Sequence, residues 1–267
     1  MSTWKLTIEY DGTRYRGWQA QSNTDRTVAG VLLRAVREFF GPDATIGGAG
    51  RTDAGVHALA QVAHLDVINA LPAETLLKRL NDALPSDINI LSIELARGRF
   101  HARHDAVARS YLYQISRRRS AFAKHFVWWV REDLDLERMR RTAEHFSGMK
   151  DFRSFTDDSP EDKSTLVAIQ RIEIAEEGDL ILVRVEGSHF LWKMVRRMVG
   201  VMVEVGRGGA TPEQAERFLM EDSGVPAKLT APASGLFLEQ VYYPGDKERP
   251  PLRALAGGLP RPRKSLK

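Results

Sequence analysis

Apolar and polar positions alternate at the start of the chain. Residues 4–10 (WKLTIEY) place Trp4 and every second residue after it on one face and polar side chains on the other. This period of two predicts a half-buried strand. In residues 27–41 (TVAGVLLRAVREFFG) the apolar side chains instead recur every three or four positions, which predicts a helix. Thr27 is suited to cap its start and Gly41 to end it.

The two patterns continue in a regular order along the chain. The first half gives strand, helix, two strands, helix and strand, with its later elements at 44–46, 60–67, 73–84 and 87–95. The second half repeats this order and adds one helix, with elements at 110–116, 136–148, 167–174, 180–187, 190–206, 211–221 and 235–243. Two βαββαβ halves predict an α+β fold of two ferredoxin-like units, with mixed or antiparallel sheets and a cleft between them.

Composition fits this organisation and limits the chemistry. The 267 residues are 43% hydrophobic, enough for a substantial core. We expect domains over 1–106 and 107–244, followed by a flexible, basic and Pro-rich tail over 245–267. The absence of an apolar leader or membrane-spanning run favours a cytoplasmic protein. The sequence contains no cysteine, which excludes disulfides, thiolate nucleophiles and Cys-ligated zinc.

The distribution of charge adds a candidate partner. The net charge is only +4, and the tail after Tyr243 supplies it, with seven Lys and Arg against two acids. Residues 97–124, however, contain eight Lys and Arg against the single acid Asp105, with four aromatic residues between them. Basic and aromatic residues together are typical of nucleic-acid binding, although a solvated basic surface has the same composition. We expect the arginines at 117–119, which follow a strand, to be available to RNA phosphates.

A glycine-rich stretch at residues 47–58 (GGAGRTDAGVHA) is the strongest candidate for a site. It places Asp53 between the glycines at 47, 48 and 50 and the glycine at 55, which allow positive φ and close approach of a ligand. Arg51 would keep the carboxylate ionised and orient it. The stretch lacks the glycine and lysine that a phosphate-binding P-loop requires. A zinc site at His57 and His64 would lack a third ligand. A carboxylate site and a simple Asx-turn both remain open on these grounds.

The sequence of this loop resembles a known family. "GAGRTDAGVHA" is similar to the signature loop of the TruA-type tRNA pseudouridine synthases. The resemblance continues, in family order, through "EYDGTRYRGWQ", "TVAGVL", "LNDALPSDI", "FHARHDAVARSYLY", "FLWKMVRRMVG" and "APASGLFLEQVYYP". It therefore covers the chain almost completely from residue 8 to residue 244.

The resemblance implies an isomerase that needs no cofactor and no metal. Such an enzyme breaks the bond from uridine N1 to the ribose, turns the base and rejoins it through C5. The implied substrate is tRNA at anticodon-arm positions 38, 39 and 40, and the implied assembly is a cytoplasmic homodimer without a membrane or nucleotide partner. Asp53 corresponds to the family's catalytic carboxylate, acting as nucleophile or as base, and Arg51 and Arg196 fall at basic positions near it.

Four further residues are implied to bind the substrate: Tyr111, Lys193, Arg103 and Arg109. Tyr111 falls at the family's active-site tyrosine, although a strand tyrosine is also typical of core packing. Lys193, Arg196 and Gly200 form one stripe on a predicted helix, and Gly200 could let an RNA phosphate approach. Trp192 and Lys193 depart from the residues expected there. Arg103 and Arg109 lie in the basic stretch.

Two other function classes remain as alternatives. A non-catalytic protein that binds structured RNA would fit the charge pattern, but the aromatic strand signature of such modules is missing. An N-glycosidase acting on nucleic acid would be expected to use two carboxylates. Neither class explains the RTDAG loop as well as an isomerase does.

Overall fold

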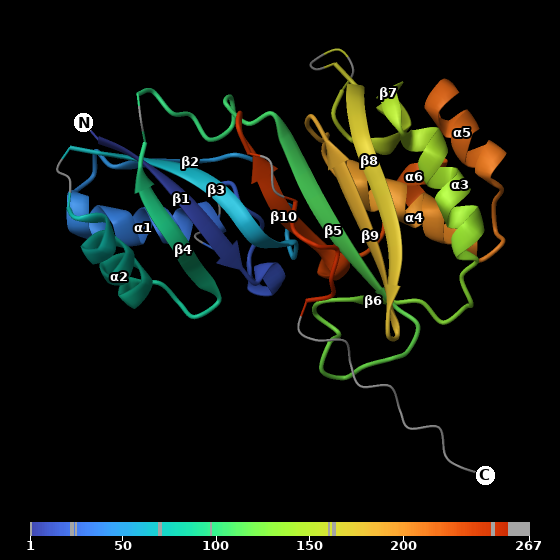
Figure 1. Cartoon of the computed structure of the whole chain (residues 1–267), viewed down its shortest axis with the longest axis horizontal. Helices are drawn as coiled ribbons and strands as arrows, with labels where there is room; N and C mark the ends of the chain where they lie inside the picture. The colour runs from blue at the N-terminus through green and yellow to red at the C-terminus, as the bar shows by residue number, and fades with distance from the viewer. Residues whose placement is uncertain are drawn as a thin grey trace, which may run out of the picture. The chain divides into compact units, whose positions relative to one another are not determined.

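A computed structural model describes residues 2–21, 24, 26–68, 71–96, 98–159, 161, 164–246 and 249–255. The described chain forms two compact units, each with its own strands and helices (Figure 1). Unit 1 comprises residues 1–110 and 237–246, and unit 2 comprises residues 111–236 with the segment 249–255.

Unit 1 has a sheet in the strand order β4-β1-β3-β10, with β2 also paired to β3. Its elements are β1 (Ser2–Tyr10), a 3-10 turn η1 (Gly12–Arg14), α1 (Val28–Phe40), β2 (Thr45–Gly48), β3 (His57–Val67), α2 (Ala73–Ala83), β4 (Ile88–Leu95) and β10 (Leu236–Tyr242). β1 runs antiparallel to β3 and β4. β10 runs parallel to β3, with Phe237 opposite His57 and Leu238 opposite Ala58.

The patterns that predicted the first strand and helix are confirmed. Trp4, Leu6, Ile8 and Tyr10 of β1 are buried, and the side chains between them are half-buried. The Thr27 side chain accepts a hydrogen bond from Gly30 N at 3.2 Å and so caps α1. Gly41 ends the helix with φ of 83°, a conformation that favours glycine.

Unit 2 has strands in the order β5-β9-β8-β7, with the short β6 beside β5. Its elements are β5 (Ala108–Ser116), β6 (Trp128–Trp129), α3 (Leu136–Phe146), β7 (Gly148–Asp151), η2 (Arg153–Phe155), β8 (Leu166–Glu177), β9 (Leu180–Gly187), α4 (Met194–Gly206), α5 (Pro212–Met220), α6 (Val225–Lys228) and η3 (Ala233–Gly235). β8 is antiparallel to both β7 and β9. α4 is apolar on nearly every face and is buried almost throughout.

The predicted α+β class is confirmed, and the order of elements in the first half is the predicted βαββαβ. Assignment of each half to the ferredoxin-like class stays a prediction. The second half contains β6, β7 and α6 in addition to the predicted elements. The units divide at Ser110, and residues 237–246 belong to unit 1, since the last strand pairs with β3. This differs from the expected division at residues 106 and 244.

The tail expected to be flexible is held over part of its length. Arg249 pairs with Glu186 at 2.6 Å, Ala254 N donates to the Glu177 carboxylate at 2.8 Å, and Leu255 N donates to Gln114 Oε1 at 2.8 Å. Residues 249–255 therefore contact unit 2, and the flexibility of the tail stays a prediction. The rest of the predicted tail from residue 256 lies outside the described residues.

Candidate active site

The Asp53 loop, residues 49–56, joins the antiparallel strands β2 and β3 in unit 1. A fully buried glutamine holds its first half: Gln61 Nε2 donates to Gly50 O at 2.8 Å, and Gly50 N donates to Gln61 Oε1 at 3.3 Å. Ala49 N also donates to Val62 O at 2.8 Å. These hydrogen bonds hold the first half of the loop against β3 in a fixed conformation.

The segment 10–18 supports the second half of the loop. Trp18 N donates to Thr52 O at 3.1 Å, and the hydroxyls of Tyr10 and Thr52 are 2.8 Å apart. A Cβ on Gly17, whose φ is 96°, would stand 2.6 Å from Thr52 O. A Cβ on Gly12 would stand 1.9 Å from the carbonyl oxygen of Val56. Only glycine permits this close contact between the two segments.

Asp53 is half-buried at the centre of the supported loop. Its carbonyl accepts a hydrogen bond from Val56 N at 3.1 Å, and Gly55 within this turn has φ of 79°. The turn is therefore closed by a backbone hydrogen bond. Arg51 is exposed two residues earlier. The loop presents a carboxylate on a rigid backbone, which suits a reacting group.

His57 is a structural residue at the end of the loop. Its side chain is buried, its Nδ1 accepts a hydrogen bond from Gly12 N at 3.1 Å, and its ring stacks on Phe237 with the centroids 4.7 Å apart. The histidine thereby ties the loop to η1 and to β10. Among the described residues, no group of three or more His, Asp or Glu side chains could hold a metal ion.

Arg109 and Arg103 occupy different environments in unit 1. The buried guanidinium of Arg109 donates to three backbone carbonyls, those of Ala49 at 3.1 Å, Arg103 at 2.8 Å and Ala106 at 3.3 Å. Arg109 therefore ties the start of the Asp53 loop to residues 103–106. Arg103 itself is exposed, so its side chain is accessible to a ligand.

The remaining predicted site residues lie in unit 2. Tyr111 is buried in β5 and meets Phe190 edge to face, with centroids 5.1 Å apart. Arg196, in the first turn of α4, is half-buried, and its Nε donates to Ala231 O at 2.7 Å. Ala231 N donates back to Arg196 O at 3.1 Å. The segment that contains Ala231 thus sets the position of the guanidinium.

Gly200 has a different role from the predicted one. A Cβ at this position would lie 1.7 Å from the carbonyl oxygen of Leu229. The close approach that glycine allows is therefore used by the protein backbone at 229–231, and the hypothesis that Gly200 admits an RNA phosphate is wrong. The predicted stripe on α4 is covered by protein at Gly200.

Lys193 is engaged within the protein. It precedes α4 with φ of 63°, and its Nζ lies 2.7 Å from Asp157 Oδ2, while the buried Arg197 pairs with the other oxygen of Asp157. The hydrogen bond from Lys193 is the largest cause that lowers the pKa of Asp157 below its ordinary value; the bond from Arg197 adds to it, and burial opposes it. Asp158 also accepts a hydrogen bond from Trp192 N at 3.0 Å.

Sequence reasoning missed Asp157 and Arg197. The composition of residues 156–165 predicts a mobile surface loop, yet Asp157 and Asp158 contact the start of α4. The available signal was Arg197 itself, since an arginine within a helix rich in Val and Met needs a partner when that helix is buried.

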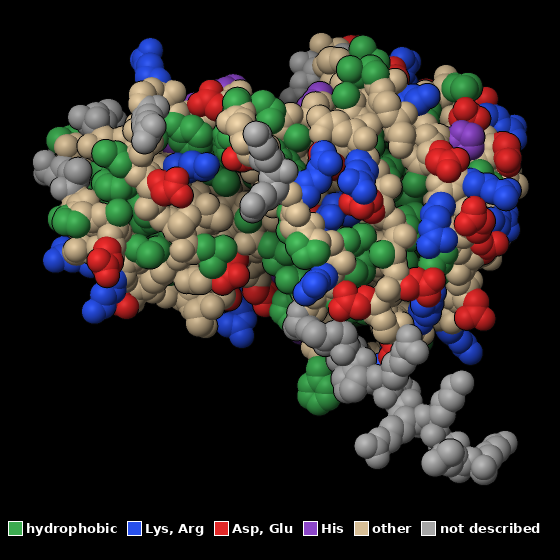
Figure 2. Space-filling model, viewed as in Figure 1, with side chains coloured by type: hydrophobic (Ala, Val, Ile, Leu, Met, Phe, Trp, Pro, Cys, Tyr) green, Lys and Arg blue, Asp and Glu red, His purple; other side chains and the backbone are tan. Residues whose placement is uncertain are grey.

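Two of the three consecutive arginines at 117–119 are paired. Arg117 Nη1 lies 2.7 Å from Glu176, and Arg118 Nε lies 2.9 Å from Asp179. These two arginines are ion-paired within the protein, and the availability of all three to phosphates stays a prediction. Figure 2 likewise shows acidic side chains among the basic ones on the visible face of unit 2.

The structure thus places Asp53, Arg51, Arg103 and Arg109 in unit 1, and Tyr111, Lys193 and Arg196 in unit 2. Within unit 1 it brings Arg109 against the Asp53 loop. Within unit 2 it brings Lys193 and Arg196 to the same end of α4. Across the described residues, no helix is long and apolar enough to cross a membrane.

Comparisons with known proteins point to the same family as the motif of the Asp53 loop. The sequence matches the model of a family described as tRNA pseudouridine synthase over residues 6–105 and 142–244. It is 43% identical to a tRNA pseudouridine synthase A of Pelobacter propionicus and 37% identical to a tRNA pseudouridine synthase A 2 of Bacillus anthracis, each over 91% of this chain and all of the relative. A tRNA pseudouridine synthase A of Geobacter sulfurreducens is 40% identical with the same coverage.

Proposed function

The chain belongs to the tRNA pseudouridine synthase family and is an isomerase of tRNA uridines, and from this premise we propose that it acts on the anticodon arm, at positions 38, 39 and 40. The observation that supports this most is the Asp53 loop. It has the sequence GRTDAGVHA, and hydrogen bonds from the buried Gln61 and the close approach of Gly12 and Gly17 hold it in place.

Asp53 is the catalytic carboxylate of the proposal. Isomerisation breaks the bond from N1 to C1′ of the ribose, forms a bond from C1′ to C5, moves a proton to N1 and releases one from C5. Asp53 acts on the sugar or the base as a nucleophile, or removes the C2′ proton as a base. A backbone that is already ordered places this carboxylate without further loss of entropy when the substrate binds. The reaction transfers no electrons, so the proposal includes no redox cofactor.

The other site residues take narrower roles. Arg51 and Arg196 orient the carboxylate, and Tyr111 contacts a target base that has been removed from its stack. Arg103 binds RNA through its exposed guanidinium. Arg109 and Lys193 support the site from within the protein, since Arg109 binds three carbonyls and Lys193 pairs with Asp157. The proposal also includes a cytoplasmic homodimer, which rests on the family resemblance.

Tritium release tests the activity. Unmodified tRNA transcripts with tritium at C5 of uridine should lose tritium in the presence of the protein, without strand cleavage or free uracil. Mapping of the product by mass spectrometry should place it at positions 38, 39 and 40. Free uracil would indicate an N-glycosidase, and RNA binding without tritium release would indicate a non-catalytic protein.

Asp53→Asn tests the assignment of the residue. An amide keeps the shape of the side chain but supplies no carboxylate, so turnover should be lost while tRNA affinity stays within a few fold. Asp66→Asn, in β3 of the same unit, is the control and should keep its activity. Near wild-type turnover by the Asp53→Asn variant would contradict the assignment.

A further inference from the structure

The segment that joins β5 to β6, residues 117–127, is basic and ordered. It contains four Lys and Arg and no acid. Ser116 Oγ donates to Arg118 O at 2.7 Å, Ala123 N donates to Ser120 Oγ at 3.2 Å, and Gln114 Nε2 donates to Phe126 O at 2.9 Å. Contacts at its start, middle and end therefore hold the segment before any ligand binds.

The two tryptophans of β6 point to opposite sides of the strand, as alternate residues do. Trp128 packs edge to face on the buried Tyr113, with centroids 6.2 Å apart. Trp129 is 41% exposed, and the guanidinium carbon of Arg119 lies 5.8 Å from the centroid of its ring. An indole plane beside a cation is thus presented to solvent.

Arg119 and Lys124 differ from the neighbouring arginines in their partners. Arg117 and Arg118 are neutralised by carboxylates of the hairpin β8–β9. Neither Arg119 nor Lys124 forms an ion pair with a carboxylate in the part of the chain that the structure describes, and both side chains are exposed. These two cations are therefore available to an anion.

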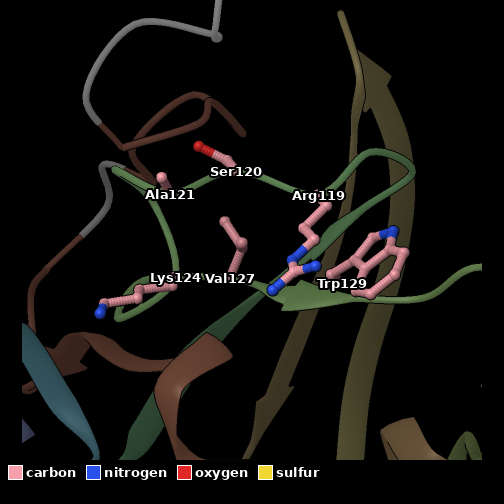
Figure 3. A pocket seen from close by; sticks show the side chains of 6 residues that line it. All are labelled: Arg119, Ser120, Ala121, Lys124, Val127 and Trp129. Carbon is pink, nitrogen blue, oxygen red and sulfur yellow. The ribbon is translucent and has the colours of Figure 1, made fainter.

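Both cations line one cavity of about 590 Å3, which lies wholly in unit 2 and which we call the Trp129 hollow (Figure 3). Its lining residues are Arg119, Ser120, Ala121, Lys124, Val127 and Trp129. Figure 3 shows Arg119 and Trp129 toward one end and Lys124 toward the other. The volume lies in the range of small-molecule sites, and no carboxylate is among the lining residues.

We propose that the Trp129 hollow binds an unpaired nucleotide of the tRNA substrate, with its phosphate between Arg119 and Lys124 and its base on the indole of Trp129. The proposal rests on the proposed function and adds an RNA contact in unit 2, whereas Asp53 lies in unit 1. Two cations without acidic partners match a phosphodiester. An exposed indole stacks on a base only where that base is unstacked, so the ligand is unpaired RNA rather than a duplex.

Binding measurements on the full chain test this proposal. The ligands are an unmodified tRNA transcript, a single-stranded oligouridylate and a blunt RNA duplex of equal length, each followed by fluorescence anisotropy at several salt concentrations. Trp129→Leu should weaken oligouridylate binding by about 5- to 150-fold, the effect of one stacked base, and leave duplex binding unchanged. Trp129→Phe keeps an aromatic plane and should retain most of the affinity.

The charges are tested with a matched pair of variants. Arg119→Ala with Lys124→Ala should reduce the slope of log K against log salt for oligouridylate by about 0.7, since the two cations share one phosphate and each single-strand phosphate contact contributes about 0.7. Arg140→Ala with Arg141→Ala removes the same charge from the exposed face of α3 and should keep the wild-type slope. Thermal unfolding of each variant checks that it is folded. Photocrosslinking of wild-type protein to bromouridine-substituted oligouridylate, mapped by mass spectrometry, should modify Trp129 and needs no variant.

Several outcomes would overturn the proposal that the Trp129 hollow binds an unpaired nucleotide. These are wild-type oligouridylate affinity in a folded Trp129→Leu variant, equal losses for single strand and duplex, an unchanged salt slope, or a crosslink that forms only at other residues. The tritium assay on wild-type protein separates the two proposals. If the wild type releases tritium and the variants bind oligouridylate as the wild type does, only the proposal of RNA binding at the Trp129 hollow is refuted. Loss of RNA affinity in the variants without tritium release by the wild type refutes only the proposed isomerisation at positions 38, 39 and 40.

Discussion

Replacement of Gln61 by leucine should lower the rate of the isomerisation step without lowering the affinity for tRNA. Gln61 is fully buried and forms two hydrogen bonds with the backbone of Gly50, at 2.8 and 3.3 Å. Leucine has nearly the same volume, so the change removes the two bonds without creating a large cavity. The first half of the Asp53 loop then loses its two side-chain hydrogen bonds to β3 and keeps the backbone bond from Ala49 N to Val62 O.

The size of the effect follows from these bonds. Each hydrogen bond contributes about 0.5–1.5 kcal/mol net, and leaving a buried partner unsatisfied costs about 1–3 kcal/mol. Gly50 is half-buried, so water can replace part of the hydrogen bonding of its backbone N–H and C=O groups. The 3.3 Å bond from Gly50 N is also long. A loss of about 2 kcal/mol is expected, which lowers the equilibrium ratio of ordered to displaced loop about 30-fold. Because a displacement of about 1 Å can cost about 100-fold in rate, the single-turnover rate at saturating tRNA should fall about 10- to 100-fold.

Asn81 provides the matched control. Its side-chain amide forms the same reciprocal pair with the backbone of Ile90, at 2.9 and 2.8 Å, in unit 1 but between α2 and β4. Asn81→Leu should therefore lower thermal stability to a similar degree and keep the wild-type rate of tritium release. The reasoning is refuted if Gln61→Leu reacts at the wild-type rate, or if both variants slow the reaction equally.

Three further predictions concern other parts of the site. Arg51→Ala or Arg196→Ala should lower the single-turnover rate more than the tRNA affinity, because orientation of one carboxylate is the proposed role; an affinity loss at unchanged rate would identify phosphate clamps. Gly200→Ala should destabilise unit 2 by about 1–3 kcal/mol in thermal or urea unfolding, since its Cβ would stand 1.7 Å from the carbonyl oxygen of Leu229; wild-type stability would disprove this. Because the folded-state pKa of Asp157 is lowered, its stabilising effect is complete above the pKa of about 3.9 in the unfolded chain and disappears as the pH falls through the folded value. The stability difference between wild type and Asp157→Asn should accordingly shrink between neutral and acidic pH, and a constant difference would contradict this ionic role.

The sequence alone determined the local features of the molecule. The alternation in residues 4–10 correctly predicted β1. The recurrence of apolar residues every three or four positions in residues 27–41 correctly predicted α1, with Thr27 as its cap. These patterns act between residues a few positions apart, so the chain near each residue is sufficient to define them. The glycines beside Asp53 likewise marked the loop, because their conformational freedom is a property of the residue itself.

Tertiary structure decided which distant segments meet. Phe237 pairs with His57, and Gly12 and Gly17 of one segment support the loop at Thr52 and Val56. The ion pairs of Asp157 with Lys193 and Arg197 likewise join residues about forty positions apart. No local pattern specifies such partners, because they depend on strand register and on which faces pack together. For the same reason, a glycine that admits RNA and a glycine that admits a backbone carbonyl look alike in sequence, and only the fold shows that Gly200 admits the carbonyl of Leu229.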